Sequence, residues 1–180
     1  MFVYWDCYFI LLGLVVQGQW ERAAGILDNL VHAVERLGHV PGYISSKTAC
    51  RSRSQSPYLT AAISEVLAYR DDPAWLTRAA AAAEREYRQY WTAEPHLTEL
   101  GLSRHFDPGN DGCVTVPDTA HYRAMAESSW DNTGRFGTDT TAVVPVDLNA
   151  QLFAWRASAS CWDSQDRPPP GGRGPQPGGR

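Results

Sequence analysis

Hydrophobic side chains recur every three or four positions along most of the first 90 residues, the spacing of one face of an α-helix. The clearest case runs from Trp20 to Leu37, where Ile26, Leu30 and Val34 fall on one face. The stretch before it is almost continuously apolar, which predicts a helix buried on most sides. The pattern predicts four helices, at residues 3–16, 20–37, 57–70 and 73–91.

Residues typical of helix ends agree with these boundaries. Gly38 directly follows the second apolar stretch, and glycine is common where a helix stops. Pro57 suits the first turn of the third helix, where a missing N–H is tolerated. Asp72 and Pro73 form a start signal for the fourth helix, with aspartate as the N-cap and proline at the first helical position. The alanine-rich stretch up to Trp91 then has high helix propensity.

The second half of the chain has a weaker pattern. Residues 94–119 contain several prolines and glycines and predict a long loop, a kind of segment that is usually functional or disordered. A short helix is expected at 120–126 and another beginning near Asp147, with no β-sheet of consequence. The chain changes character at about residue 158, and residues 167–180 are almost wholly Pro, Gly, Arg and Gln, which cannot bury apolar surface. The expected organisation is an all-α folded segment at 1–157 and a disordered tail at 158–180.

The composition is that of a soluble globular domain. The 180 residues are 43% hydrophobic and 20% charged, which is enough for one core. The net charge is −4 and the acids are scattered, so no basic patch indicates a nucleic-acid partner. Seven Trp and eight Tyr could stack on sugar rings, but composition alone favours a role in the core.

The apolar run from Tyr8 to Val16 does not have the features of a leader peptide or a membrane span. No basic residue precedes it, Asp6 stands at its entrance, and no small-residue cleavage site follows. It is also shorter than the roughly 20 residues needed to cross a bilayer. We therefore expect a cytoplasmic protein without membrane attachment.

The cysteines are far apart in the sequence and form no C-x-x-C pair. This spacing indicates neither a zinc site nor a dense disulfide framework, and reduced thiols are the expectation for a cytosolic protein. The four positions are Cys7, Cys50, Cys113 and Cys161.

Three polar segments stand at predicted helix boundaries. In the first and third, Asp6 and Asp131 directly follow a tryptophan, and an indole beside a carboxyl group raises its pKa, as a general acid working near neutral pH requires. Arg53 and Gln55 in the second could hydrogen-bond to sugar hydroxyls or equally cap a helix. Each segment taken alone is more simply a solvated helix end, so the residues by themselves predict a helical protein with a polar cleft. The segments are Tyr4-Trp5-Asp6, Arg53-Ser54-Gln55-Ser56-Pro57-Tyr58-Leu59-Thr60 and Ala126-Glu127-Ser128-Ser129-Trp130-Asp131-Asn132.

These segments resemble, in order, the signatures of the trehalase family of glycoside hydrolases. Y-W-D-C-Y-F-I-L-L-G-L, from Tyr4, resembles the family's first Trp-Asp signature, and R-S-Q-S-P-Y-L-T, from Arg53, is similar to its R-S-Q-P-P segment. A-E-S-S-W-D-N-T-G-R-F, from Ala126, resembles A-E-S-G-W-D, and V-P-V-D-L-N-A, from Val144, matches closely. The resemblance implies part of an (α/α)₆ toroid of helical hairpins. It also implies inverting hydrolysis of α,α-trehalose, a small-molecule sugar, to glucose without a metal or other cofactor.

The resemblance also implies roles for individual residues. Asp131 occupies the position of the family's general acid, and Ser129 that of a motif glycine whose backbone faces the substrate. Asp118 corresponds to the glutamate of an R-P-E segment in which Val116 replaces the arginine. The positions that the family uses to bind glucose are Trp5, Asp6, Arg53, Ser54 and Gln55. We expect these segments to converge on one surface, with Asp131 in the more protected, apolar surroundings.

The departures from the family pattern are as informative as the matches. The family's general base lies in the C-terminal part of its barrel, and nothing after Ala150 resembles that part. Twelve helices of ~12 residues with ~5-residue connections need on the order of 200 residues, whereas five or six helices are predicted here. The chain is therefore expected to be truncated and inactive alone, and the sequence does not indicate an oligomeric state. Two alternatives stay open: a related enzyme acting on another α-glucoside, and a helical carbohydrate-binding scaffold without catalysis.

Overall fold

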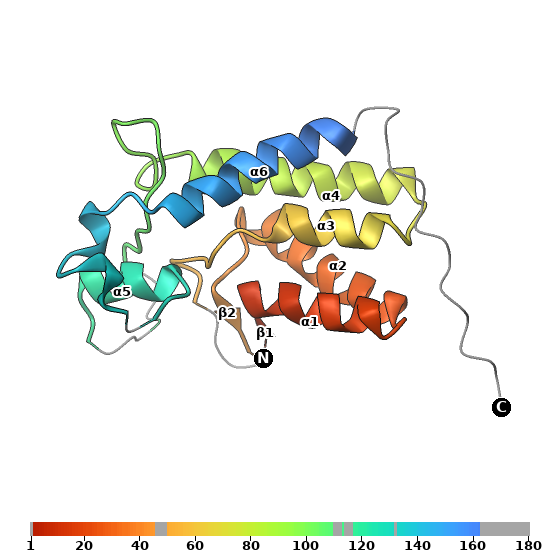
Figure 1. Cartoon of the computed structure of the whole chain (residues 1–180), viewed down its shortest axis with the longest axis horizontal. Helices are drawn as coiled ribbons and strands as arrows, with labels where there is room; N and C mark the ends of the chain where they lie inside the picture. Colours follow the sequence, from red (N-terminus) through yellow and green to blue (C-terminus); the bar gives the residue numbers. More distant parts are fainter. Residues whose placement is uncertain (1, 46–49, 110–112, 114–116, 132, 163–180) are drawn as a thin grey trace.

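The computed structural model of the chain describes residues 2–45, 50–109, 113, 117–131 and 133–162 (Figure 1). The helices are α1 (Tyr4–Val16), α2 (Trp20–Leu37), α3 (Leu59–Leu67), α4 (Pro73–Glu86), α5 (Ala120–Glu127) and α6 (Val146–Trp162). Shorter turns are the π-helix η1 (Tyr87–Trp91) and the 3₁₀ turns η2 (Gly134–Phe136) and η3 (Thr140–Ala142). Strands β1 (Phe2–Val3) and β2 (Tyr43–Ile44) pair antiparallel, and the described residues form no other strands. The expected all-α fold is confirmed.

Two of the three predicted helix-end signals are confirmed. Gly38 ends α2 in the left-handed conformation, with a φ of 91°, and its N–H donates to the carbonyl of Val34. Asp72 caps α4, because its side chain accepts a 3.0 Å hydrogen bond from the backbone N–H of Trp75. The prediction for Pro57 is wrong, since α3 begins at Leu59 and the proline lies before the helix.

Helix α4 continues directly into a π-helical turn. The predicted helix at 73–91 is helical throughout, but its last five residues, Tyr87–Trp91, form η1. The wider turn is closed by the N–H of Thr92, which donates to the carbonyl of Tyr87. Single π-turns inside helices are often found at functional sites.

The long helices form antiparallel hairpins around one core. Helix α2 packs on α1, α3 and α4, and α3 also packs on α6. In Figure 1 the N-termini of α1, α3 and α6 lie at the same end of the bundle, where α5 and the loops also gather. The core between these helices is formed by fully buried aliphatic side chains, among them Leu11, Leu27, Val31, Leu59 and Ile63.

The prediction that the first helix is buried on most sides is wrong. Helix α1 buries one face, through Tyr4, Cys7, Leu11 and Val15. On its other face Phe9 and Val16 are 50% and 87% exposed in the part of the chain that the structure describes. A nearly continuous apolar run cannot indicate which face is covered, because every face of such a helix is similarly hydrophobic.

Helix α6 extends beyond the end of the expected folded segment at residue 157. It continues past residue 157 to Trp162, whose indole is 9% exposed and packs against the main core. Near its start, Leu148 and Leu152 form a second, smaller apolar cluster with Trp91. The greater part of the tail predicted to be disordered, residues 163–180, lies outside the described residues.

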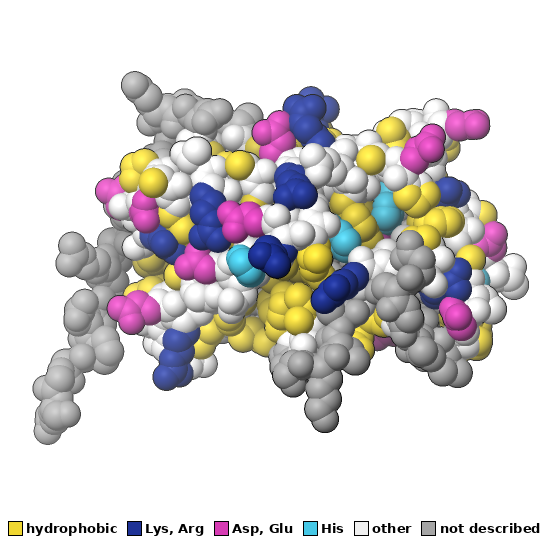
Figure 2. All heavy atoms as spheres, turned by 180° about the vertical axis from the view of Figure 1, so that it is seen from behind, with side chains coloured by type: hydrophobic (Ala, Val, Ile, Leu, Met, Phe, Trp, Pro, Cys, Tyr) yellow, Lys and Arg dark blue, Asp and Glu magenta, His cyan; other side chains and the backbone are white. Residues whose placement is uncertain are grey.

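The surface carries both signs of charge. On the face shown in Figure 2, basic and acidic side chains are interspersed between small hydrophobic areas, with no large region of one sign. No helix of the described residues combines the length and the apolar character needed to cross a membrane.

Candidate active site

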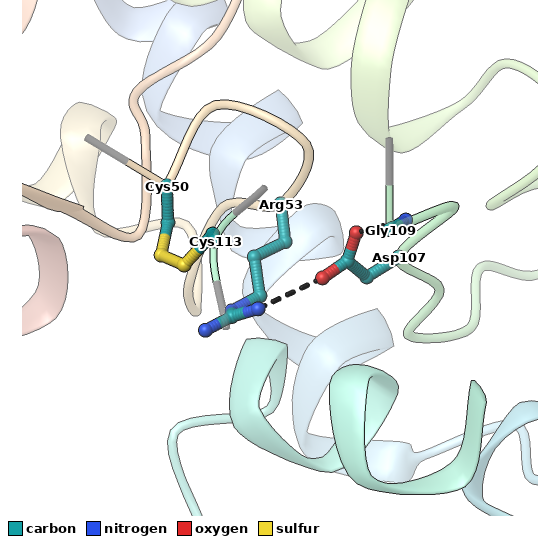
Figure 3. The surroundings of a disulfide bond; sticks show 5 residues. All are labelled: Cys50, Arg53, Asp107, Gly109 and Cys113. Carbon is teal, nitrogen blue, oxygen red and sulfur yellow. Dashed lines mark hydrogen bonds and ion pairs between the residues drawn. A yellow bond between two sulfur atoms is a disulfide. The ribbon is translucent and has the colours of Figure 1, made fainter. Parts of the chain in front are cut away.

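The segment that follows Cys50 contains a buried ion pair. Arg53, 6% exposed, donates from its Nη1 to the Oδ2 of Asp107 at 2.9 Å, and the Asp107 side chain is fully buried (Figure 3). The other carboxylate oxygen of Asp107 accepts the N–H of Gly109 at 2.8 Å. Because a guanidinium has five N–H donors, one bond to Asp107 can orient Arg53 while other donors serve a ligand. Asp107 lies in the long loop at 94–119 and was not among the predicted site residues.

A disulfide joins the same two parts of the chain. Cys50, three residues before Arg53, is bonded to Cys113, six residues after Asp107 (Figure 3). The expectation of four reduced thiols is therefore wrong. Sequence spacing could not reveal this pair, because the two cysteines are 63 positions apart and meet only through the folded loop. Cys7 is a free, buried thiol on α1.

Glu127, in the third polar segment, is at the centre of a buried hydrogen-bond network. Its carboxylate is fully buried and lies 3.1 Å from Nε2 of His96 and 3.6 Å from Nδ1 of His105. Burial alone would raise the pKa of Glu127, but the charges of the two imidazoles and the hydrogen bond from His96 outweigh it and hold the pKa well below its usual range. The remaining donors to the carboxylate are the backbone N–H groups of Ser54 (3.2 Å) and Phe106 (2.8 Å) and the hydroxyl of Tyr90.

The turn that follows Glu127 has an unusual backbone. Ser129 and Asp131 have φ angles of 65° and 47°, a left-handed conformation that favours glycine and is uncommon for other residues. This explains in physical terms why the family motif has glycine at the position of Ser129. Two hydrogen bonds from Ser56 hold the turn against the second segment. The N–H of Ser56 donates to Oγ of Ser129 at 3.3 Å, and the hydroxyl of Ser56 donates to the carbonyl of Ser128 at 3.2 Å.

The first polar segment also reaches the second. The backbone N–H of Trp5 donates to Oε1 of Gln55 at 3.3 Å, at the N-terminus of α1. Trp5 and Gln55 are partly buried, whereas Asp6 is exposed in the first turn of the helix. Ser54 is fully buried, and its hydroxyl donates to the carbonyl of Val40 at 2.6 Å. The structure therefore brings together Trp5, Gln55 and Ser129 through hydrogen bonds of the second segment.

The expectation that Asp131 has protected, apolar surroundings is wrong for this chain, because Asp131 is exposed. The neighbouring Trp130 is 48% exposed, and its indole N–H donates to Oδ2 of Asp147 on α6 at 2.7 Å. The guanidinium of Arg135 lies over the Trp130 ring and pairs with Asp147 at 3.0 Å. Although partial burial opposes it, these bonds lower the pKa of Asp147. The indole is thus committed to α6.

Asp118 is tied to the base of α5. Its carboxylate, 67% exposed, accepts a 2.6 Å bond from Arg123, whose Nε donates to the carbonyl of Asp107. A chain of polar contacts therefore runs from Asp118 through Arg123 and Asp107 to Arg53. Among the described residues, no group of three or more His, Cys, Asp or Glu side chains has the arrangement of a metal site.

The sequence model of the trehalase family matches residues 2–109, more than half of the chain. This chain belongs to the trehalase family. A periplasmic trehalase of Pseudomonas aeruginosa is 32% identical over 189 aligned positions, which cover 83% of this chain and 34% of the relative. A periplasmic trehalase of Escherichia coli is 29% identical, with 83% and 33% covered. This trehalase-family chain therefore spans about a third of the length of the curated relatives it matches.

A solved trehalase structure has the same fold as the chain. The neutral trehalase of Saccharomyces cerevisiae superposes with a TM-score of 0.74 and 23% sequence identity, covering 90% of this chain and 37% of that one. The helical hairpins of the trehalase-family chain are therefore part of an (α/α)₆ toroid, as expected from the motifs.

The expectation of a cytoplasmic location is contradicted. The relatives in Pseudomonas aeruginosa and Escherichia coli are named periplasmic trehalases. The Cys50–Cys113 disulfide agrees with this correction, because disulfides persist in oxidising compartments and are rare in the cytosol. The cytoplasmic expectation depended on the scattered cysteines and on the apolar run without a leader pattern. Neither observation reveals which cysteines come together in the folded chain.

Proposed function

We propose that this chain is the acid-bearing part of an inverting, trehalase-type glycoside hydrolase that converts α,α-trehalose to glucose. The observation that carries the proposal is the meeting of the three polar segments. Trp5 is bonded to Gln55, and Ser129 is bonded to Ser56, although these segments are about 50 and 73 positions apart. They are the same segments that resemble the family's sugar-binding and acid signatures. The names of the relatives supply the substrate, α,α-trehalose.

In this proposal Asp131 is the general acid that protonates the leaving oxygen. Its exposure in this chain is compatible with the role if other parts of the whole enzyme cover it when sugar is bound, since burial is what keeps a carboxylic acid protonated near neutral pH. We assign sugar contacts to Trp5, Asp6, Arg53, Gln55, Asp118 and the backbone of Ser129. Ser54 supports the segment instead, because its side chain is fully buried and donates to Val40.

The second carboxylate of an inverting enzyme must activate water on the opposite face of the sugar, about 6.5–9.5 Å from the acid. Two acids close to the acid-bearing turn, Glu127 and Asp147, are already engaged. Glu127 is fully buried among its donors, and Asp147 is paired with Arg135 and Trp130. We therefore infer that the general base belongs to the two thirds of the relatives' length that this chain does not span.

The test exchanges this chain for the aligned third of the Pseudomonas aeruginosa periplasmic trehalase and follows glucose release from trehalose. The chimera should be active, and Asp131→Asn should lower its kcat by about 10²–10⁴-fold, the usual contribution of a general acid. The matched control is Asp139→Asn, an exposed aspartate that caps η3, which should leave kcat unchanged. The isolated chain should release no glucose.

Each possible result supports or refutes a specific part of the proposal. Full activity of the Asp131→Asn chimera would refute the acid assignment. Glucose release by the isolated chain, abolished by Asp131→Asn, would show that a base lies within the chain. If the isolated chain binds trehalose and the chimera folds without turnover, the carbohydrate-binding scaffold replaces the enzyme as the better description.

The proposed location is an oxidising compartment such as the periplasm. It rests on the names of the relatives and on the Cys50–Cys113 disulfide. Trapping free thiols in intact cells with a membrane-permeant alkylating reagent, followed by mass spectrometry, should find Cys50 and Cys113 unmodified. Complete alkylation of both cysteines in native protein would contradict the proposal.

A further inference from the structure

The turn that carries Asp131 is strained and needs to be held in place. Ser129 and Asp131 both have left-handed φ angles. For residues with a Cβ atom this conformation is unfavourable, although aspartate tolerates it better than most. Such conformations persist where the surroundings determine them, and they concentrate at functional sites.

Glu127 is placed to determine this turn, because it is the last residue of α5 and directly precedes the turn. Its carboxylate joins three other parts of the chain: Ser54 in the second polar segment, Tyr90 in η1, and His96 and Phe106 in the loop at 94–109. Each carboxylate oxygen accepts a backbone N–H, so the side chain fixes backbone positions as well as side chains.

The bonds around Glu127 cannot easily be replaced by bonds to water. The carboxylate and the ring of His96 are both buried, at 0% and 3% exposure. A buried carboxylate is tolerated only when it is paired and hydrogen-bonded, and it loses much of that compensation if it moves away from its donors. The end of α5, and with it the start of the turn, is therefore fixed relative to Ser54 and the sugar-binding segment.

We propose that Glu127 is a positioning residue, whose buried carboxylate holds the left-handed turn that presents Asp131 to the sugar. It does not touch the substrate. It acts by connecting the acid-bearing turn to the segment of Arg53, Ser54 and Gln55, so that the proton donor and the sugar contacts keep one geometry. This inference rests on the proposed function for the meaning of that geometry, but the anchoring itself is a property of the chain without ligand.

The experiment compares Glu127→Gln with Glu86→Gln in the isolated chain. Both glutamates are buried, at 0% and 3% exposure, but Glu86 bonds to Tyr4 and Val40 and not to the turn. Glutamine at 127 keeps the size of the side chain but directs an N–H₂ group at N–H donors. Backbone chemical shifts measured by NMR should lose their left-handed values at Ser129 and Asp131 in Glu127→Gln. They should keep them in Glu86→Gln.

A milder variant covers the case in which Glu127→Gln does not fold. Tyr90→Phe removes one donor to Glu127 and should shift the same two residues by a smaller amount. The proposal is overturned if the turn keeps its left-handed shifts in a folded Glu127→Gln chain. It is also overturned if Glu127→Gln unfolds while Tyr90→Phe leaves the turn unchanged, because Glu127 is then only a core residue.

The measurement needs no sugar and no turnover, so its failure is separate from failure of the proposed function. An inactive chimera with an intact turn would count against the hydrolase alone. A turn that does not respond to Glu127 would count against the positioning role, even if Asp131 proves to be the acid.

Discussion

Replacing Glu86 by glutamine should make the chain more stable at pH 8 and change it much less at pH 5. Glu86 is buried at the end of α4, where one carboxylate oxygen accepts the hydroxyl of Tyr4 and the other the N–H of Val40, each at 2.9 Å. Removal from water raises its pKa to about 7, although both hydrogen bonds act in the opposite direction. Glutamine imitates the protonated acid, since its oxygen can accept from Val40 and its N–H₂ can donate to Tyr4.

The sign and size follow from proton linkage. Because the folded pKa lies above the unfolded value of 4.5, the native state binds the extra proton, and stability falls as the pH rises from about 4.5 to about 7. At 1.36 kcal/mol per unit, the loss is about 1 kcal/mol at pH 5 and about 3 kcal/mol at pH 8. The advantage of Glu86→Gln over the unchanged chain should therefore grow by about 2 kcal/mol between these pH values.

The assay is urea denaturation of both proteins at pH 5 and pH 8, read as the difference in unfolding free energy. His39 beside Val40 has its own pKa lowered to about 4 by burial, but this pH dependence is common to both proteins and cancels in the difference. The control is Glu84→Gln, which removes an exposed ion pair with Arg88 worth about 0.3–0.5 kcal/mol. A difference for Glu86→Gln that is the same at both pH values would refute the reasoning.

Three further outcomes can be checked on the same chain. Reducing the Cys50–Cys113 disulfide should lower the unfolding free energy by about 2–4 kcal/mol, measured by denaturation with and without reductant. Cys7 should resist alkylation in the native protein, because burial raises the pKa of its thiol to about 11. Mass spectrometry after iodoacetamide treatment measures this, and a fully alkylated Cys7 would contradict the prediction. Asp107→Asn should cost about 3–5 kcal/mol by leaving the buried Arg53 charge without its partner, and a melting temperature equal to that of the unchanged chain would contradict this.

The helices were predictable where local chemistry decides them. Gly38 and Asp72 mark helix ends because a left-handed residue and a side-chain acceptor satisfy backbone groups within a few positions. Pro57 misled because proline is also compatible with the residues just before a helix. The covered face of α1 was not predictable, since Phe9 and Leu11 are equally apolar and only their neighbours in space distinguish them.

The candidate site divides in the same way. Motif resemblance identified the segments that meet, and the left-handed backbone at Ser129 explains why the family motif has glycine at that position. The supporting roles of Glu127 and Asp107 were missed, although Glu127 lies in the third polar segment, because both roles depend on partners up to 73 positions away. The polar loop at 94–119 was the one sequence signal for Asp107, because it is too long to be a simple connection.

The π-helical turn at the end of α4 makes chain length critical at that point. A π-turn holds one residue more than an α-turn, so every later residue is rotated by about 100° relative to a continuous α-helix. That rotation lets the Tyr90 hydroxyl meet the N–H of Ser54 at 2.7 Å, while Trp91 turns into the second core. Deleting the exposed Gln89 would restore an uninterrupted helix. The side chains of Tyr90 and Trp91 would then rotate away from Ser54 and from the smaller apolar cluster. The identity of residue 89 can therefore change freely during evolution, but a gain or loss of one position would break the hydrogen bond between Tyr90 and Ser54 that connects the helical bundle to the candidate site.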